Sequence, residues 1–195
     1  MAPRILVFAG SIRAGAYSGK TADAAVRELA LQGADVNRIS LADFPLPLMN
    51  QDLEKESGVP EPAVSLANMI AAHDGLLIAT PEYNASIPPL LKNTIDWVSR
   101  VNRDAEGRPF RAFKGKATAL CSSSDGNYAG IRAINHLRAV LVHCGAEVVS
   151  SQCSVPRGQD AFDEDGNFRE ASLRRSMTTV CTALIERARM LSSRS

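Results

Sequence analysis

Residues 75–100 read Gly75-Leu-Leu-Ile-Ala-Thr80, Pro81-Glu-Tyr-Asn-Ala-Ser-Ile-Pro88 and Pro89-Leu-Leu-Lys-Asn-Thr-Ile-Asp-Trp-Val-Ser-Arg100. The first part is a short apolar run, typical of a buried strand. In the last part Leu91, Ile95 and Val98 recur at helical spacing, and the two prolines before them suit the entry to a helix. A polar turn with a carboxylate, a phenol and an amide lies between. Ligands of open α/β sheets bind outside the carboxyl ends of strands, so we expect a site at this turn.

Further apolar runs alternate with helical patterns on both sides of this stretch. Strands are predicted at 4–9, 34–41, 75–80, 116–121 and 146–150, and helices from 18 to about 33 and over 63–72, 88–101, 134–144 and 173–191. Residues 42–62 and 102–114 are predicted as loops, the first long enough to be either functional or poorly ordered. The alternation predicts one α/β domain, residues 1–195, with a flavodoxin-like three-layer sandwich. Its five-stranded parallel sheet is expected in the order 2-1-3-4-5.

A glycine-containing loop follows the first predicted strand, at the switch point of this topology. Gly10 and Gly15 allow backbone conformations in which amides converge on an anion. A helix that begins near Ser18 adds its partial positive charge, and Arg13, Ser11 and Ser18 offer donors to a phosphate. The loop lacks the lysine of a P-loop and the Gly-x-Gly-x-x-Gly of dinucleotide-binding folds. It is either a phosphate-binding loop or an ordinary strand-to-helix turn.

The quoted turn and helix resemble the NADPH-dependent FMN reductase family, which includes flavin, quinone, chromate and azo reductases. The resemblance rests on Pro81–Asn84, Ser86–Pro88, Leu91–Trp97 and the loop Gly10–Arg13. It covers most of the chain and weakens after about residue 150. It implies that FMN lies at the switch point, with its phosphate on the first loop and its ring along the turn after residue 80. The implied cofactor-binding residues are Ser11, Arg13, Ser18, Gly19, Pro81, Glu82, Tyr83, Asn84, Ser122, Ser123 and Gly126.

The chain departs from the family pattern at two places. It has Gly15-Ala-Tyr-Ser-Gly19 where the family has Gly-Ser-(Phe/Tyr)-Asn-Arg, and Asp125-Gly126 where a Gly-Gly pair is common. One lost hydrogen bond to a charged group weakens binding by about tenfold. We therefore expect FMN to bind, but loosely enough to be lost in purification. Glu82 is either a structural carboxylate or a functional one.

Composition narrows the classes of partner. Apolar residues make up 45% of the 195, charged residues 22%, and the formal net charge is +1, so neither nucleic acid nor a membrane is an expected partner. Four scattered cysteines, without Cys-x-x-Cys spacing, and the lack of a signal pattern predict a cytoplasmic protein without a metal site. No side chain stands out as a catalytic acid, base or nucleophile, which fits a flavoenzyme because the cofactor carries the redox chemistry.

The resemblance implies an FMN-dependent NAD(P)H oxidoreductase that works by a ping-pong mechanism. Its electron acceptor would be a small molecule such as a quinone, free flavin, chromate or an azo compound. The family also implies a homodimer or homotetramer, with Trp97 near the contact, although a single tryptophan also fits the core. Three alternatives remain: a flavodoxin-type electron carrier, a reductase that uses FMN as a diffusible substrate, and a flavin-free sensor module.

Overall fold

The computed structural model describes residues 1–104 and 106–193, and at its centre is a parallel sheet of five strands in the order β2-β1-β3-β4-β5. The strands are β1 (Arg4–Ala9), β2 (Asp35–Ile39), β3 (Gly75–Pro81), β4 (Ala117–Ser123) and β5 (Glu147–Val155). The flavodoxin-like fold and the strand order predicted from the sequence are confirmed. That residues 1–195 form one domain stays a prediction, and residues 105, 194 and 195 lie outside the described part.

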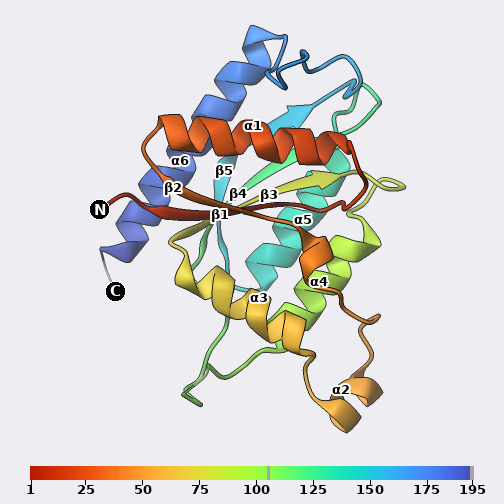
Figure 1. Ribbon diagram of the computed structural model, residues 1–195, viewed down its shortest axis with the longest axis vertical. Helices are drawn as coiled ribbons and strands as arrows, with labels where there is room; N and C mark the ends of the chain where they lie inside the picture. Colours follow the sequence, from red (N-terminus) through yellow and green to blue (C-terminus); the bar gives the residue numbers. More distant parts are fainter. Residues whose placement is uncertain (105, 194–195) are drawn as a thin grey trace.

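Helices cover both faces of the sheet (Figure 1). One face carries α1 (Tyr17–Leu31) and α6 (Ala171–Ser192), and the other carries α3 (Glu61–Ala72), α4 (Pro89–Arg100) and α5 (Ile131–His143). Successive side chains of a strand point to opposite faces. Ile5 and Val7 of β1 therefore pack in the core beneath α1 and α6, and Leu6 packs beneath the other three helices. Among the described residues, no helix is both long and apolar enough to cross a bilayer.

The loops after β1, β3 and β4 meet at the carboxyl edge of the sheet. β1 pairs with β3 in parallel, with Ala9 opposite Ala79, and β3 pairs with β4, with Pro81 opposite Ser123. The Gly10 amide continues the first ladder by donating to the Ala79 carbonyl at 2.8 Å. Parallel pairing in this register brings together segments that lie far apart in the sequence.

The interval 42–62 is not the uniform loop predicted from its proline and acidic content. It contains a 3-10 turn, η1 (Leu41–Asp43), and a short helix, α2 (Gln51–Ser57). The Asn50 side chain caps α2 by accepting from the Asp52 amide at 2.8 Å, and Gly58, at φ 78°, ends it. α2 buries none of its own residues, so it has no apolar stripe by which a pattern could find it.

The chain before α2 is fastened to α4. Trp97 is fully buried, and its indole nitrogen donates to the Pro47 carbonyl at 2.8 Å. Asn93 donates to the same carbonyl at 2.9 Å and accepts from the Met49 amide at 2.7 Å. Trp97 is thus a core residue of its own chain, and a subunit contact near α4 stays a prediction.

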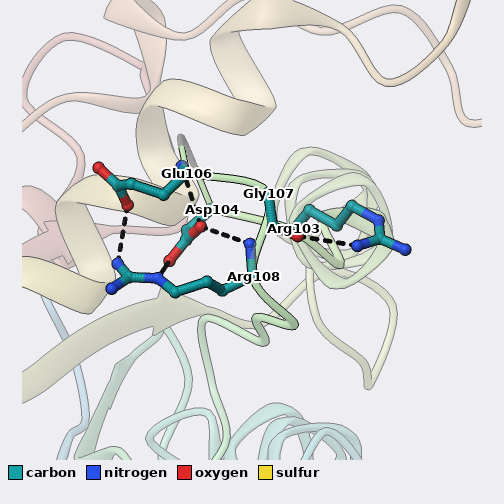
Figure 2. A network of polar contacts seen from close by, with 5 residues as sticks. All are labelled: Arg103, Asp104, Glu106, Gly107 and Arg108. Carbon is teal, nitrogen blue, oxygen red and sulfur yellow. Dashed lines mark hydrogen bonds and ion pairs between the residues drawn. The ribbon is translucent and has the colours of Figure 1, made fainter.

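Two further segments differ in detail from the sequence prediction. β5 extends to Val155 rather than ending at residue 150, because a bulge takes up extra residues: Thr118 pairs with Val148, whereas Leu120 pairs with Gln152. The loop after α4 is polar as predicted and has its own network (Figure 2). There the Arg108 guanidinium donates to Asp104 and Glu106 at 2.7 Å each, and Arg103 donates to the Gly107 carbonyl at 2.8 Å.

Candidate functional site

A pocket of about 110 Å³ lies where the three loops meet. Of the predicted cofactor residues, it is lined by Ser11, Arg13, Ser18, Pro81, Glu82, Tyr83 and Ser123. It is also lined by four residues that the sequence argument did not select, Ala16, Tyr17, Ser124 and Asp125. Each of the four lies within two residues of a selected one, so their position in the two loops was the available signal. A liquid water occupies about 30 Å³, so the pocket suits a group such as a phosphate.

The amino end of α1 opens onto this pocket. Ala16 precedes the helix and has no side-chain acceptor, and the first turn contains no acidic residue. In the described part of the chain, no side chain accepts from the amides of Tyr17, Ser18 or Gly19. The unsatisfied amides and the partial positive charge of the helix end therefore remain available to an anion.

Gly15 and Gly10 have different roles in this loop. Gly15 is left-handed, at φ 68°, and turns the chain into α1. Gly10 is not left-handed, contrary to the sequence expectation; it packs closely instead, because a Cβ there would lie 3.0 Å from Leu91 Cδ2 and would require that side chain to shift. Only Gly15 thus supplies the unusual backbone angle that was expected of both.

Two buried hydroxyls in the pocket have no partner. Ser18 and Ser123 are each 1% exposed, and within the described residues neither Oγ atom has a hydrogen-bond partner. A buried polar group left unsatisfied costs about 1–3 kcal/mol, so such groups point to a missing ligand. Arg13 adds a positive charge that is paired with no carboxylate in the described chain, its guanidinium donating only to the Ala14 carbonyl at 3.4 Å. The Ser18 hydroxyl, the free amides and the guanidinium together match the oxygens of a phosphate, and the Ser123 hydroxyl remains for another polar group of the same ligand.

A wider hollow of about 300 Å³ adjoins the pocket and shares Ser11, Arg13 and Tyr83 with it. Its remaining wall is largely apolar and consists of Gly10, Ile12, Pro88, Pro89 and Leu90. Ile12 and Tyr83 are 55% and 46% exposed, which is high for large apolar side chains. A flat aromatic group next to the smaller pocket would cover part of this surface.

The Glu82 carboxylate binds to the amino end of α5. Its side chain is only 7% exposed, forms an ion pair with Arg132, and accepts from the amides of Arg132 and Ala133 at 3.1 and 3.3 Å. Burial would raise the pKa of Glu82, but the hydrogen bonds from Arg132 and from the Ala133 amide outweigh it, so the pKa is lowered. Glu82 thus caps α5, whereas the amino end of α1 has no such carboxylate.

The remaining selected residues do not line the pocket. Ser122 donates from its buried hydroxyl to the Ala129 carbonyl at 2.7 Å and shares a second hydrogen bond of 3.0 Å with the Ser154 hydroxyl, and so supports the loop from below. The Gly126 carbonyl accepts from the Arg157 amide at 3.3 Å. Asn84 lies at the tip of the turn after β3, and Gly19 lies in the first turn of α1.

The segment after β5 supports the site and was missed from the sequence. Gly158 donates its amide to the Ser124 carbonyl at 2.9 Å, and a Cβ on Gly158 would lie 2.4 Å from Tyr17 Cγ. This glycine therefore joins the loop after β4 to the start of α1. Gly158 has this role because the fold brings it close to Tyr17, which is far from it in the sequence.

Comparisons with known proteins point to one family. The model of the NADPH-dependent FMN reductase family matches residues 3–160. A quinone reductase of Escherichia coli is 36% identical over 148 residues, covering 75% of this chain and 73% of its own. An NAD(P)H-dependent FMN reductase of Pseudomonas aeruginosa is 34% identical over 173 residues, covering 88% and 87%. Among solved structures, the flavoenzyme NAD(P)H:(acceptor) oxidoreductase FerB of Paracoccus denitrificans superposes with a TM-score of 0.75 at 26% identity, covering 97% of this chain and 98% of FerB.

Proposed function

Since the chain belongs to the NADPH-dependent FMN reductase family, we propose that it oxidises NAD(P)H at a bound FMN and passes the electrons to a small-molecule acceptor. The observation that carries the proposal is the pair of buried, unpartnered hydroxyls beside the uncapped amino end of α1. FMN, when bound, supplies the chemistry by accepting a hydride on its ring and returning two electrons.

The chain's own part is to bind and orient. The amides of Tyr17, Ser18 and Gly19, the hydroxyls of Ser11 and Ser18, and Arg13 would hold the phosphate. The turn from Pro81 to Asn84 and the Ser123 hydroxyl would border the ring, with Gly126 contributing backbone only and Ser122 supporting Ser123. Glu82 acts indirectly, because its carboxylate is committed to α5. No side chain is assigned an acid or base role, so positioning is the protein's main contribution.

Donor and acceptor would use the same open side of the site in turn, which is a ping-pong scheme. The apolar hollow lined by Ile12, Pro88 and Leu90 favours flat, uncharged acceptors such as quinones. A relative in Burkholderia that is 31% identical over 92% of this chain is named a 2-hydroxy-1,4-benzoquinone reductase, which supports a quinone as acceptor. Free flavin, chromate and azo compounds are further candidate acceptors, and competition among them in steady-state assays ranks them.

The proposed homodimer or homotetramer is tested by light scattering coupled to size-exclusion chromatography.

The test is an anaerobic absorbance experiment on the purified protein with added FMN. Flavin bands that shift on binding and bleach within seconds of adding NADPH, then recover when a quinone is added, are the expected result. Parallel double-reciprocal plots for NADPH and quinone support the ping-pong scheme. Bound flavin that stays oxidised with NADPH and NADH overturns the proposal in favour of a flavodoxin-type electron carrier. No binding at high micromolar FMN overturns it in favour of a flavin-free module.

A further inference from the structure

The turn that borders the proposed flavin site is strained. Tyr83 and Ser86 exchange two backbone hydrogen bonds, of 2.9 and 3.0 Å, and the two residues between them are left-handed, Asn84 at φ 48° and Ala85 at φ 65°. Asparagine adopts this conformation comparatively easily, but for alanine it is unfavourable because of its Cβ. Such a conformation persists only where the surrounding structure holds it.

Two residues of α5 hold this turn from outside. Arg132 binds the Glu82 carboxylate through its guanidinium and its amide, just before the turn. One helical turn later, His136 Nδ1 lies 3.0 Å from Ser86 Oγ, at the other end of the turn. Positions 132 and 136 are four apart and so share one face of the helix. The turn is therefore fastened to α5 at both ends.

The contact of His136 with the turn, unlike that of Arg132, is not explained by helix capping. Glu82 satisfies amides that α5 would otherwise leave free, so its contact serves the helix itself. The contact between Ser86 and His136 joins two side chains and satisfies no helix end. Its effect is to fix Ser86, whose backbone is bonded to Tyr83, and Tyr83 lines both the phosphate pocket and the apolar hollow.

We propose that His136 is a positioning residue for the bound flavin: through Ser86 it fixes the turn that carries Tyr83. It does not touch the cofactor, and the inference rests on the proposed function because it concerns the same site. Without the contact, the turn would sample other conformations, and the flavin would bind more weakly and in an altered environment. We expect the loss of this hydrogen bond to change the affinity about three- to tenfold, which corresponds to about 0.7–1.4 kcal/mol.

The test uses His136→Leu, which removes the ring nitrogens, and His136→Asn, whose amide returns a polar atom near the position of Nδ1. FMN affinity, the visible spectrum of bound flavin and the turnover number per bound flavin are measured for each. We expect His136→Leu to weaken FMN binding about three- to tenfold and to shift the spectrum and turnover, and His136→Asn to restore all three. His143→Leu is the matched control, because His143 lies on the same helix at its far end.

Ser86→Ala removes the other partner and keeps the test decisive if His136→Leu does not fold. Ser86→Ala should reproduce the effect of His136→Leu, and the double variant should be no worse than either single variant, because both remove one interaction. Unchanged affinity and spectrum in Ser86→Ala, an additive double variant, or a His136→Asn variant as impaired as His136→Leu overturns the proposal. If the unmodified protein binds no FMN, the proposed function fails and this inference with it. If that protein turns over NADPH and the variants match it, only the inference fails.

Discussion

At the scale of single residues, the hydroxyl of Ser18 is expected to oppose folding and favour binding. Its Oγ is buried without a partner, so Ser18→Ala should leave the free energy of unfolding unchanged or raise it by about 1 kcal/mol without ligand. The same change should weaken FMN binding about tenfold or more, because a hydrogen bond to a charged phosphate is lost. Urea denaturation and fluorescence titration measure the two quantities.

The control for Ser18 is Ser176→Ala on α6, where the hydroxyl already donates to the Ser172 carbonyl at 3.0 Å. That variant should bind FMN normally. If Ser18→Ala also keeps full FMN affinity, the hydroxyl does not contact the phosphate.

Ala85 shows how much local strain the turn tolerates. At φ 65° a side chain is unfavourable, and Ala85→Gly removes that strain while making the unfolded chain more flexible. The net expectation is a free energy of unfolding raised by up to about 1 kcal/mol, or a melting temperature raised by about 2–4 °C. Ala139→Gly on exposed α5 surface is the matched control and should lower stability by about 1 kcal/mol. Calorimetry showing the same sign for both variants would contradict the strain argument.

At the scale of elements, the cap of α5 by Glu82 makes part of the stability depend on pH. The pKa of Glu82 is lowered in the folded protein, so the ionised form stabilises the fold above the ordinary glutamate pKa of about 4.3. This contribution is lost as the pH falls through the folded-state pKa. Glu82→Gln should lower the free energy of unfolding by about 1 kcal/mol at pH 7, as for other lost caps.

Urea titrations of Glu82→Gln and the unmodified protein at pH 7 and pH 3 check this expectation. The difference between the two proteins should shrink at pH 3, which lies below the ordinary glutamate pKa of about 4.3 that holds in the unfolded chain. A difference that is equal at both pH values would show that the carboxylate charge is not what caps the helix.

The elements also show what the sequence can and cannot predict. Buried strands such as β3 and amphipathic helices such as α4 follow from periodicity, because their burial requires an apolar pattern. α2 buries nothing, so only its Asn50 cap and terminal Gly58 mark it. The extension of β5 depends on a bulge opposite β4, which is a relation between strands rather than a property of one segment.

The residues of the site also divide into those that a local sequence pattern predicts and those that it does not. Ser11, Arg13 and Ser18 could be predicted from the sequence, because a phosphate loop needs glycine, hydroxyl and guanidinium groups within a few residues. The commitment of Glu82 to Arg132 and the contact of Ser86 with His136 each join positions 50 residues apart. Neither leaves a local pattern, so both required the fold to be known.

At the scale of the whole molecule, the packing of helices on the sheet shields the thiols from solvent. Cys121, Cys153 and Cys181 are buried between the sheet and the layer of α1 and α6, whereas Cys144 is half-buried. The side-chain hydrogen bond between Cys121 and Cys153, together with burial, raises the pKa of Cys121, and burial raises that of Cys181. Since the thiolate is the reactive form, iodoacetamide should modify only Cys144 in the native protein, and that slowly. Mass spectrometry that finds Cys121 or Cys181 alkylated without denaturant would show that this layer opens.

The carboxyl edge of the sheet joins loops from three strands, so a ligand bound there should stabilise the whole fold. At a free FMN concentration about 100 times its dissociation constant, binding adds about 2.7 kcal/mol, or about 5–10 °C in melting temperature for a chain of this size. Riboflavin has the same ring without the phosphate, so it cannot engage the free amides of α1, Arg13 or Ser18. At the same concentration, we expect riboflavin to give less than about a third of the FMN shift in calorimetry. Ser18→Ala should reduce the FMN shift and leave the riboflavin shift unchanged. Equal shifts with FMN and riboflavin would mean that the loop after β1 and the Ser18 hydroxyl do not bind the phosphate.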